Sequence, residues 1–285
     1  MSRQLFCDFE CHEILKDNGD YIYLYKSDDH ARKLGLDEMN LLESLSHKIP
    51  LLDTHDKVRI DDRTGFKIKA DSLDLMAFEI RNNQENLQNY AIRLADILIK
   101  LHQVELSSAV MKSLNLRSLS RFEDYIKKMT CLTEYKDKLL ELHTHIADGA
   151  SLCHLDLGPY HVLKVNGKDN LIGLHSLSIG NPMADIAKSI FWICSGYVPG
   201  IRTYLMTEKA KRDFVHFFID RYRSELHYNE EEVIKWLVIL AALEFDTEYP
   251  EEGMREDLTG MKGLVEAYFS GEEIDYLGYL IWFDD

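Results

Sequence analysis

The sequence predicts an α+β protein of two lobes, in which a small β-rich N-terminal lobe precedes a larger helical lobe with a central β-hairpin. Three observations support this. Short β-rich segments surround one helix in residues 1–85, helical periods follow through residues 86–285, and a β-rich insert interrupts them at residues 151–174. Strands followed by helices are typical of α+β architecture, and 285 residues suffice for two lobes that share a cleft.

The first lobe begins with strand signals. Residues 20–26 (DYIYLYK) are rich in aromatic and β-branched side chains and follow Asn18-Gly19, a hairpin turn signal. Residues 31–47 have the apolar spacing of a helix, which Pro50 ends. Two further short strands are expected, at residues 58–60 and 66–70.

The second lobe is predicted from helical periods. They run through residues 87–104, 119–129, 132–147, 182–194, 208–226 and 229–245. Between the third and fourth of these, residues 162–165 and 170–174 flank Asn166-Gly167. That pattern predicts a β-hairpin inside the helical lobe.

Composition limits the function. Lys+Arg 33 against Asp+Glu 49 gives a net charge of −16, which repels phosphate backbones and disfavours nucleic-acid binding. No apolar run approaches the length of a membrane span, and the N-terminal residues lack a signal peptide's apolar core. The five cysteines are scattered, which indicates reduced, buried thiols. We therefore expect a cytoplasmic protein with no membrane or nucleic-acid partner.

Residues 225–285 concentrate the negative charge. They hold 17 acidic residues against three basic ones, so they carry −14 of the total −16. Such a segment is either a solvated helical surface or a negative field that attracts a cationic ligand. The chain then ends in an apolar run, residues 274–283, which either packs back onto the helical lobe or docks on a protein partner.

The hairpin is preceded by a loop that carries chemistry, residues 153–163 (CHLDLGPYHVL). A His, an Asp two residues later and a polar side chain five residues after that Asp fit a phosphoryl-transfer loop. The segment resembles the H-G-D-L-x-P-x-N-[IV]-L loop of the aminoglycoside phosphotransferase and choline kinase family. The resemblance implies a two-lobed protein-kinase-like fold.

Other motifs of that family occur in the same order. Residues 179–187 (IGNPMADIA) look like its G-D-P-x-x-D-[IL]-A motif, and residues 98–102 (LIKLH) resemble its L-x-x-L-H helix end. In the first lobe, residues 38–50 have its E-x-x-x-[LM]-x-x-L…P spacing, with Lys26 closing a strand 12 residues earlier. The resemblance covers about residues 10–245.

The resemblance implies a role for each matching residue. Asp156 would be the catalytic base, Lys26 would bind the nucleotide phosphates, and Glu38 would hold Lys26 in place. His154 and Asp185 would have structural roles in the loop. ATP with Mg²⁺ is the implied cofactor.

Three departures from the family pattern bear on whether the protein can catalyse phosphoryl transfer. His161 takes the place of the metal-binding Asn, a change that some macrolide-phosphorylating relatives share. The metal-binding Asp falls on Gly173, and a small gap would place His175 there instead, so His161 and His175 are the candidate metal ligands. The phosphate-covering turn, within residues 6–12, has no glycine and carries Asp8 and Glu10. Because glycine lets backbone amides approach phosphate, this turn is poorly suited to that task.

Two hypotheses follow. The first is ATP-dependent O-phosphorylation of a small hydroxylated molecule, with Glu244, Asp246 and Glu248 gripping a cationic acceptor. The second is a pseudokinase that senses a nucleotide or serves as an interaction scaffold. Transfer of a nucleotide on the same fold is a third option that no residue selects.

Overall fold

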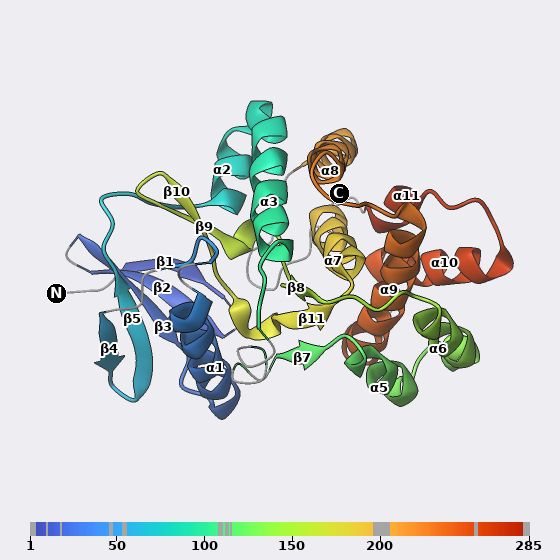
Figure 1. Ribbon diagram of the computed structural model, residues 1–285, viewed down its shortest axis with the longest axis horizontal. Helices are drawn as coiled ribbons and strands as arrows, with labels where there is room; N and C mark the ends of the chain where they lie inside the picture. The colour runs from blue at the N-terminus through green and yellow to red at the C-terminus, as the bar shows by residue number, and fades with distance from the viewer. Residues whose placement is uncertain are drawn as a thin grey trace.

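The computed structural model describes residues 4–9, 11–17, 19–45, 48–52, 56–107, 111, 114, 116–195, 206–253 and 256–281. Figure 1 shows a β-sheet region at one end of the molecule and a helical region at the other, as the sequence predicts. Within the described residues, no helix is both long and apolar enough to cross a membrane.

The first lobe is a five-stranded antiparallel sheet in the order β1-β2-β3-β5-β4. Its strands are β1 (Gln4–Asp8), β2 (His12–Asp17), β3 (Asp20–Tyr25), β4 (Lys57–Ile60) and β5 (Arg63–Ile68). Asp17 pairs with Asp20 across the predicted hairpin turn, and Gly19 there has φ +94°. Helix α1 (Asp29–Leu45) packs against β3 and β5. The predicted strands and helix are therefore present, with shifts of a few residues at their ends.

A smaller sheet connects the lobes. The predicted hairpin forms from β9 (Val162–Val165) and β10 (Lys168–Leu171), and β6 (Leu73–Leu75) pairs with β9 on its other side. Helix α2 (Met76–Asn82) follows β6 and packs on β9. Strand β6 precedes the lobe boundary expected at residue 85 and nevertheless pairs within the second lobe.

A third sheet and the helices form the rest of the second lobe (Figure 1). The sheet has the order β7-β11-β8, from β7 (Arg117–Ser118), β11 (Ser178–Gly180) and β8 (Ser151–Cys153). Around it lie α3 (Leu87–His102), α5 (Arg121–Lys128), α6 (Lys136–Thr144), α7 (Pro182–Ser195), α8 (Glu208–Arg223), α9 (Glu230–Glu252), α10 (Glu256–Ser270) and α11 (Tyr276–Leu280). Helix α9 continues past residue 245, where the sequence predicted its end. The prediction stopped too early because the last turns are polar and carry no apolar period.

One apolar core extends through both lobes, and a small second cluster (Leu15, Ile22 and Leu24) covers the opposite face of the first sheet. The apolar tail belongs to the main core as far as residue 281. Leu277, Leu280 and Ile281 are buried, and α11 packs on α7 and α10. In this part of the tail the apolar side chains pack back onto the helical lobe, whereas Trp282 and Phe283 lie outside the described residues.

Candidate functional site

Asp156 lies in the loop between β8 and β9, as the sequence pattern indicates. Its Oδ1 accepts a hydrogen bond from Trp192 Nε1 at 2.7 Å, and its Oδ2 lies 3.4 Å from His161 Nε2. The carboxylate side chain keeps 22% of its surface exposed. Asp156 is therefore held in one orientation while still accessible to a ligand.

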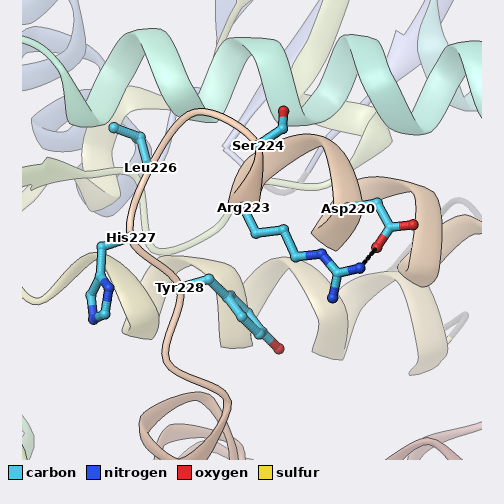
Figure 2. A pocket seen from close by; sticks show the side chains of 6 residues that line it. All are labelled: Asp220, Arg223, Ser224, Leu226, His227 and Tyr228. Carbon is cyan, nitrogen blue, oxygen red and sulfur yellow. Dashed lines mark ion pairs between the residues drawn. The ribbon is translucent and has the colours of Figure 1, made fainter.

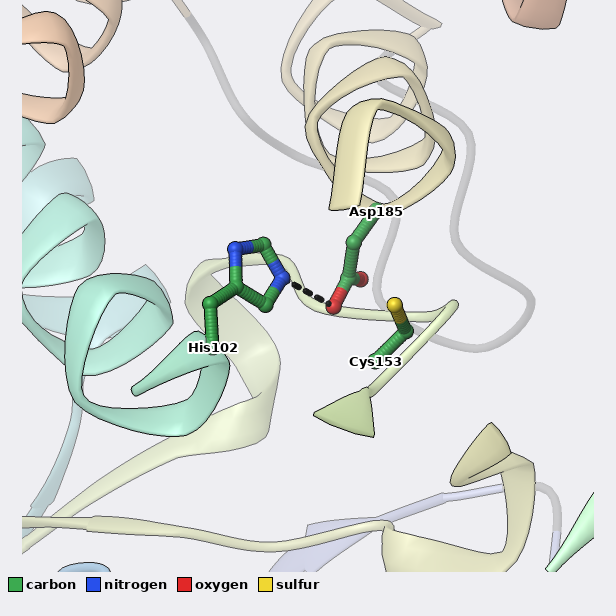
Figure 3. A group of neighbouring side chains, drawn as sticks. All are labelled: His102, Cys153 and Asp185. Atoms are coloured by element: carbon green, nitrogen blue, oxygen red, sulfur yellow. Dashed lines mark hydrogen bonds and ion pairs between the residues drawn. The ribbon is translucent and has the colours of Figure 1, made fainter. Parts of the chain in front are cut away.

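Asp185 is the buried brace of this loop. Its carboxylate accepts hydrogen bonds from His154 N at 2.6 Å and Leu155 N at 2.8 Å, and its Oδ2 lies 3.1 Å from His102 Nε2 (Figure 3). Leu155 has φ +59°, a left-handed conformation that costs free energy in a branched residue. The two amide contacts to Asp185 stabilise that conformation, which turns the chain toward Asp156.

Cys153 completes a buried trio with His102 and Asp185 (Figure 3). Their potential ligand atoms lie within 4.8 Å of one another. The Cys153 thiol, however, faces the carbonyl oxygens of Gly180 and Asn181, and burial raises its pKa well above the usual value. Because metals bind the thiolate and the Asp185 oxygens already accept three donors, the trio is a hydrogen-bonded brace.

His154 and His161 are both neutral imidazoles. Burial lowers the pKa of His154 to about 4 and that of His161 to about 3, and each ring lies near other histidines. His154 Nε2 lies 3.1 Å from the Ile172 carbonyl oxygen, to which the neutral ring can donate. His154 is thus a packed residue of the loop.

Gly173 occupies the position where the family pattern has a metal-binding Asp. Its φ of +75° is left-handed, and a Cβ added there would lie 2.5 Å from His161 Cδ2 and 2.8 Å from His161 Nε2. The His161 ring therefore fills the space that a side chain at position 173 would need. The nearest upstream carboxylate is Asp169, four residues before Gly173. Its Oδ2 accepts a hydrogen bond from Arg93 Nε at 2.8 Å.

Glu38 is only 2% exposed, and its carboxylate accepts hydrogen bonds from four donors. Two come from tyrosine hydroxyls of β3, Tyr23 at 3.2 Å and Tyr25 at 3.0 Å. The other two come from backbone amides of the second lobe, Gly173 N at 2.7 Å and Leu174 N at 2.9 Å. Glu38 thus connects the two lobes at the point where the metal-binding Asp is missing.

The predicted contact between Lys26 and Glu38 is wrong. Lys26 Nζ instead lies 3.0 Å from Asp8 Oδ1, in the turn that would cover the phosphates. The physical reason is strand alternation: β3 turns Tyr21, Tyr23 and Tyr25 toward the main core, so the next residue faces the other way.

Aromatic side chains fill the first lobe beneath the phosphate-covering turn. Phe9 is buried and stacks on His12 at 4.3 Å between ring centroids, and His12 stacks on Tyr23 at 4.2 Å. Tyr23 stacks in turn on Phe66 at 4.8 Å. Glu10, also noted in this turn, lies outside the described residues. An apolar stack at this place leaves backbone amides little room to surround a phosphate.

His175 lies close enough to His161 to help lower the pKa of that ring, after the larger effect of burial. Among the described residues, the one group of three potential ligands within 4.8 Å is the brace around Asp185, which contains neither histidine. Within the described part of the chain, the pair expected as metal ligands therefore belongs to no group of three ligands at that spacing.

The three acidic residues expected to grip an acceptor do not converge. Glu244 Oε2 lies 3.6 Å from Lys188 Nζ. Asp246 Oδ1 accepts hydrogen bonds from Thr130 N at 2.6 Å and Cys131 N at 2.5 Å, so it anchors the chain between α5 and α6. Positions 244 and 246 differ by two residues, which places them on nearly opposite faces of α9, whereas Glu248 shares the face of Glu244.

Lys188 is a residue that the sequence analysis missed. Its ammonium group lies 4.3 Å from the centroid of the Trp192 ring, the same ring that donates to Asp156. A cation over an aromatic face next to a carboxylate is a stable arrangement. A lysine of this chain thus occupies the aromatic and acidic surface beside Asp156. The four-residue spacing of positions 188 and 192 could have predicted their contact, because such residues share a helix face.

Two cavities lie away from Asp156. One, of about 700 Å³, is at the connection between α8 and α9, where Figure 2 shows Asp220 and Arg223 paired at its edge. The other, of about 450 Å³, lies between β7 and α5. Neither is lined by Lys26, Glu38 or Asp156.

Comparison with known proteins places the fold. The sequence matches no protein-family model and no curated protein. The structure is similar to choline kinase LicA from Streptococcus pneumoniae, with a TM-score of 0.62, 14% identity, and coverage of 95% of this chain and 94% of that chain. It is also similar to amicoumacin kinase hAmiN, with a TM-score of 0.63, 14% identity and coverage of 96% and 90%.

An aminoglycoside-3'-phosphotransferase of type VIII gives a TM-score of 0.59 at 16% identity, over 85% of this chain and 94% of that chain. At these identities the likeness establishes the fold alone. The chain has the two-lobed, protein-kinase-like fold of choline kinases and aminoglycoside phosphotransferases, as the sequence motifs predict.

Proposed function

We propose that this chain is a pseudokinase: a kinase-fold protein that has lost metal-assisted phosphoryl transfer and acts by binding another molecule. The observation that carries the proposal is the set of contacts around Glu38. In a working kinase this carboxylate holds the lysine that binds the phosphates. Here two tyrosine hydroxyls and two backbone amides use its oxygens instead.

A lysine could reach Glu38 only by displacing these donors. The carboxylate is buried, so any donor that lost it would remain without a partner in a region of low dielectric. Lys26 in turn would have to leave Asp8 and cross to the other face of β3. Both changes are unfavourable, which supports a stable arrangement without the lysine–glutamate pair.

The two positions that hold the metal in the family pattern, 161 and 173, support the same proposal. Magnesium prefers oxygen ligands in octahedral geometry. Position 173 offers no side chain, and His161 offers a neutral ring whose space excludes one there. Removing one group that stabilises transition-state charge costs about 10²–10³ in rate, so losing the metal carboxylate and the lysine together leaves little transfer.

One observation favours the second candidate, ATP-dependent phosphorylation of a small hydroxylated molecule. Asp156 is present, partly exposed and held by Trp192, as a catalytic base should be. A cationic acceptor fits this candidate less well, because Lys188 already occupies the Trp192 face beside Glu244. Such an acceptor would have to displace that internal cation.

The proposal keeps the setting and the partners that the sequence leads us to expect. All five cysteines are free thiols, four of them buried, which suits a reducing, cytoplasmic environment. A pseudokinase of this kind acts on a small molecule or on a protein partner through its surface, with no role for a nucleic acid or a membrane.

The first experiment is calorimetric titration of ATP without metal, with Mg²⁺ and with Mn²⁺, using Lys26→Ala as the control. We expect either no binding at millimolar ATP or weak binding that neither metal strengthens. Metal-dependent binding that Lys26→Ala removes would overturn the proposal. In that case Asp156→Ala should abolish transfer to an acceptor while leaving nucleotide affinity within a few-fold.

A second experiment rebuilds the metal site. The double variant His161→Asn with Gly173→Asp supplies both family ligands and removes the ring that blocks position 173, and Asp tolerates left-handed backbone better than most residues. We expect Mg²⁺-dependent ATP binding in the double variant and not in His161→Asn alone. A folded double variant that binds no better than wild type would show that the metal positions do not limit binding.

A further inference from the structure

The cavity between β7 and α5 is lined by three cationic side chains. Arg117 of β7 and Arg121 and Lys128 of α5 line about 450 Å³ of space that is open to solvent on one side. Asp124 is the acidic residue in the lining. In a chain of net charge −16, this local excess of positive charge needs an explanation.

These cations have no ion pair with an acidic residue in the part of the chain that the structure describes. Among the ion pairs of the described residues, none includes Arg117, Arg121 or Lys128, whereas the neighbouring Lys127 pairs with Glu123 at 2.5 Å. Asp124 lines the cavity without an ion pair to any of the three. The cavity therefore has an uncompensated charge of about +2, counted as three cations and one carboxylate.

Arg121 is the strongest sign of a ligand. Its Nε and Nη1 are buried and have no hydrogen-bond partner within the described residues. Burial lowers the pKa of Arg121, and the charge of Arg117 lowers it further, against an opposing effect of Tyr125. The residue as a whole is partly exposed, so its charge acts at the edge of the cavity. An anion there would offset a guanidinium charge that has no ion pair among the described residues.

The start of α5 adds to the attraction. The helix begins at Arg121, and the side chain of Ser120 before it makes no capping hydrogen bond. Ser118 and Ser120 both line the cavity with hydroxyl groups that can donate. The positive end of the helix dipole lies beside Arg121, and it acts through charge alone, because the amides of Ser120, Phe122 and Glu123 already donate within the chain.

We propose that this cavity binds the phosphate group of a small phosphorylated molecule. A phosphate monoester carries about −1.5 to −2 charges near neutral pH, which matches the charge of the lining. Guanidinium groups bind its oxygens in a planar, bidentate manner, so paired arginines favour phosphate over a simple halide. The exposed ring of Tyr125 at the edge offers an apolar surface for the rest of the ligand.

This site is separate from the kinase-type cleft and does not depend on the proposed pseudokinase function. It shares no lining residue with the contacts of Lys26, Glu38 or Asp156. It is nevertheless connected to the loop before Asp156, because Ser178 of β11 pairs with Arg117 on one side and with Cys153 on the other.

The test uses the full chain and inorganic pyrophosphate as the probe. Pyrophosphate should raise the melting temperature by about 5 °C or more at saturation, compared with sodium chloride at matched ionic strength. Arg121→Gln and Arg117→Gln should each reduce the pyrophosphate affinity at least tenfold in calorimetric titration. Lys127→Gln removes the same charge from the same helix at a position paired with Glu123, so it should bind like wild type.

Two further measurements make the result decisive. Arg117→Gln changes an exposed residue at a strand end, so it tests the site even if Arg121→Gln does not fold. Lys26→Ala should leave pyrophosphate binding unchanged, which places the probe outside the nucleotide end of the cleft. Stabilisation equal to that of sodium chloride, or binding that Lys26→Ala removes and the arginine variants retain, would overturn the proposal.

Discussion

Two buried carboxylates, Asp185 in the second lobe and Glu38 in the first, show how differently the two ends of the kinase-type cleft are built. Both accept backbone amides, and both are almost fully buried. Asp185 accepts hydrogen bonds from the loop that carries Asp156, whereas Glu38 accepts hydrogen bonds from tyrosine hydroxyls where the family pattern predicts a lysine.

The difference teaches what each carboxylate does for the fold. Asp185 acts within one lobe, so its contacts are needed whether or not the protein transfers phosphate. Glu38 connects strand β3 to the turn at Gly173 and Leu174, so it is a link between the lobes. Glu38 thus has a structural reason to stay buried that does not depend on pairing with a lysine.

The largest expected effect is at Asp185. Asp185→Ala leaves two amides and His102 without their acceptor in the core, and we expect a loss of about 3–5 kcal/mol in the free energy of unfolding. Urea denaturation measures it. Asp156→Ala is the matched control, since this partly exposed carboxylate should change stability by less than about 1 kcal/mol. Equal losses would contradict the distinction between brace and site.

The link at Glu38 can be broken one donor at a time. Tyr25→Phe removes a hydroxyl that donates to the buried carboxylate at 3.0 Å, and we expect a loss of about 1.5–3 kcal/mol. Tyr21→Phe, on the same face of β3 and without a bond to Glu38, serves as the control. Amide exchange at Gly173 and Leu174 should also accelerate in Tyr25→Phe, and unchanged exchange there would argue against a link between the lobes.

The histidines between these carboxylates make stability depend on pH. Burial lowers the pKa of His154 to about 4, that of His161 to about 3 and that of His12 well below its usual value. Below about pH 6.5 the unfolded chain takes up protons that the folded state refuses, so stability should fall as pH drops from 6.5 toward 4. Each histidine contributes up to about 1.4 kcal/mol per pH unit.

His161→Asn isolates one part of this dependence. The variant should lose stability less steeply than wild type between pH 6.5 and 4.5, as measured by urea denaturation at several pH values. His145→Asn, which replaces an exposed histidine at the end of α6, is the comparison variant. A wild-type slope in His161→Asn would mean that His161 is protonated in the folded state.

The sequence predicted the fold and the order of its motifs because these depend on local periods and short spacings. It also predicted that position 173 lacks a metal ligand, since Gly173 follows from the register of the motif itself. The Lys26–Glu38 contact failed because motif spacing says nothing about strand faces. Counting alternate positions from Tyr23 and Tyr25 would have placed Lys26 on the opposite face.

Other parts of the site were beyond sequence reasoning. Trp192 donates to Asp156 from 36 positions away, and Glu38 meets Gly173 from 135 positions away. Such contacts arise from packing of separate elements, and no local pattern encodes them. The replacement of a side chain at 173 by the His161 ring is likewise visible only when both backbones are placed.

The smallest expected effect is at Lys26, the residue that the family pattern would make most important. Its ion pair with Asp8 spans 3.0 Å, and the two side chains keep 34% and 56% of their surface exposed. Exposed pairs of this kind contribute roughly 0–1 kcal/mol and weaken with salt. Lys26→Ala should therefore change the free energy of unfolding by less than about 1 kcal/mol, and less still at 1 M salt.

Arg93→Ala is the contrasting variant. Arg93 is mostly buried between Glu79 and Asp169, so its loss should lower the free energy of unfolding several times more. If Lys26→Ala instead matched Arg93→Ala, Lys26 would be making a buried contact, and the first lobe would be closer to a working nucleotide site than its tyrosines indicate.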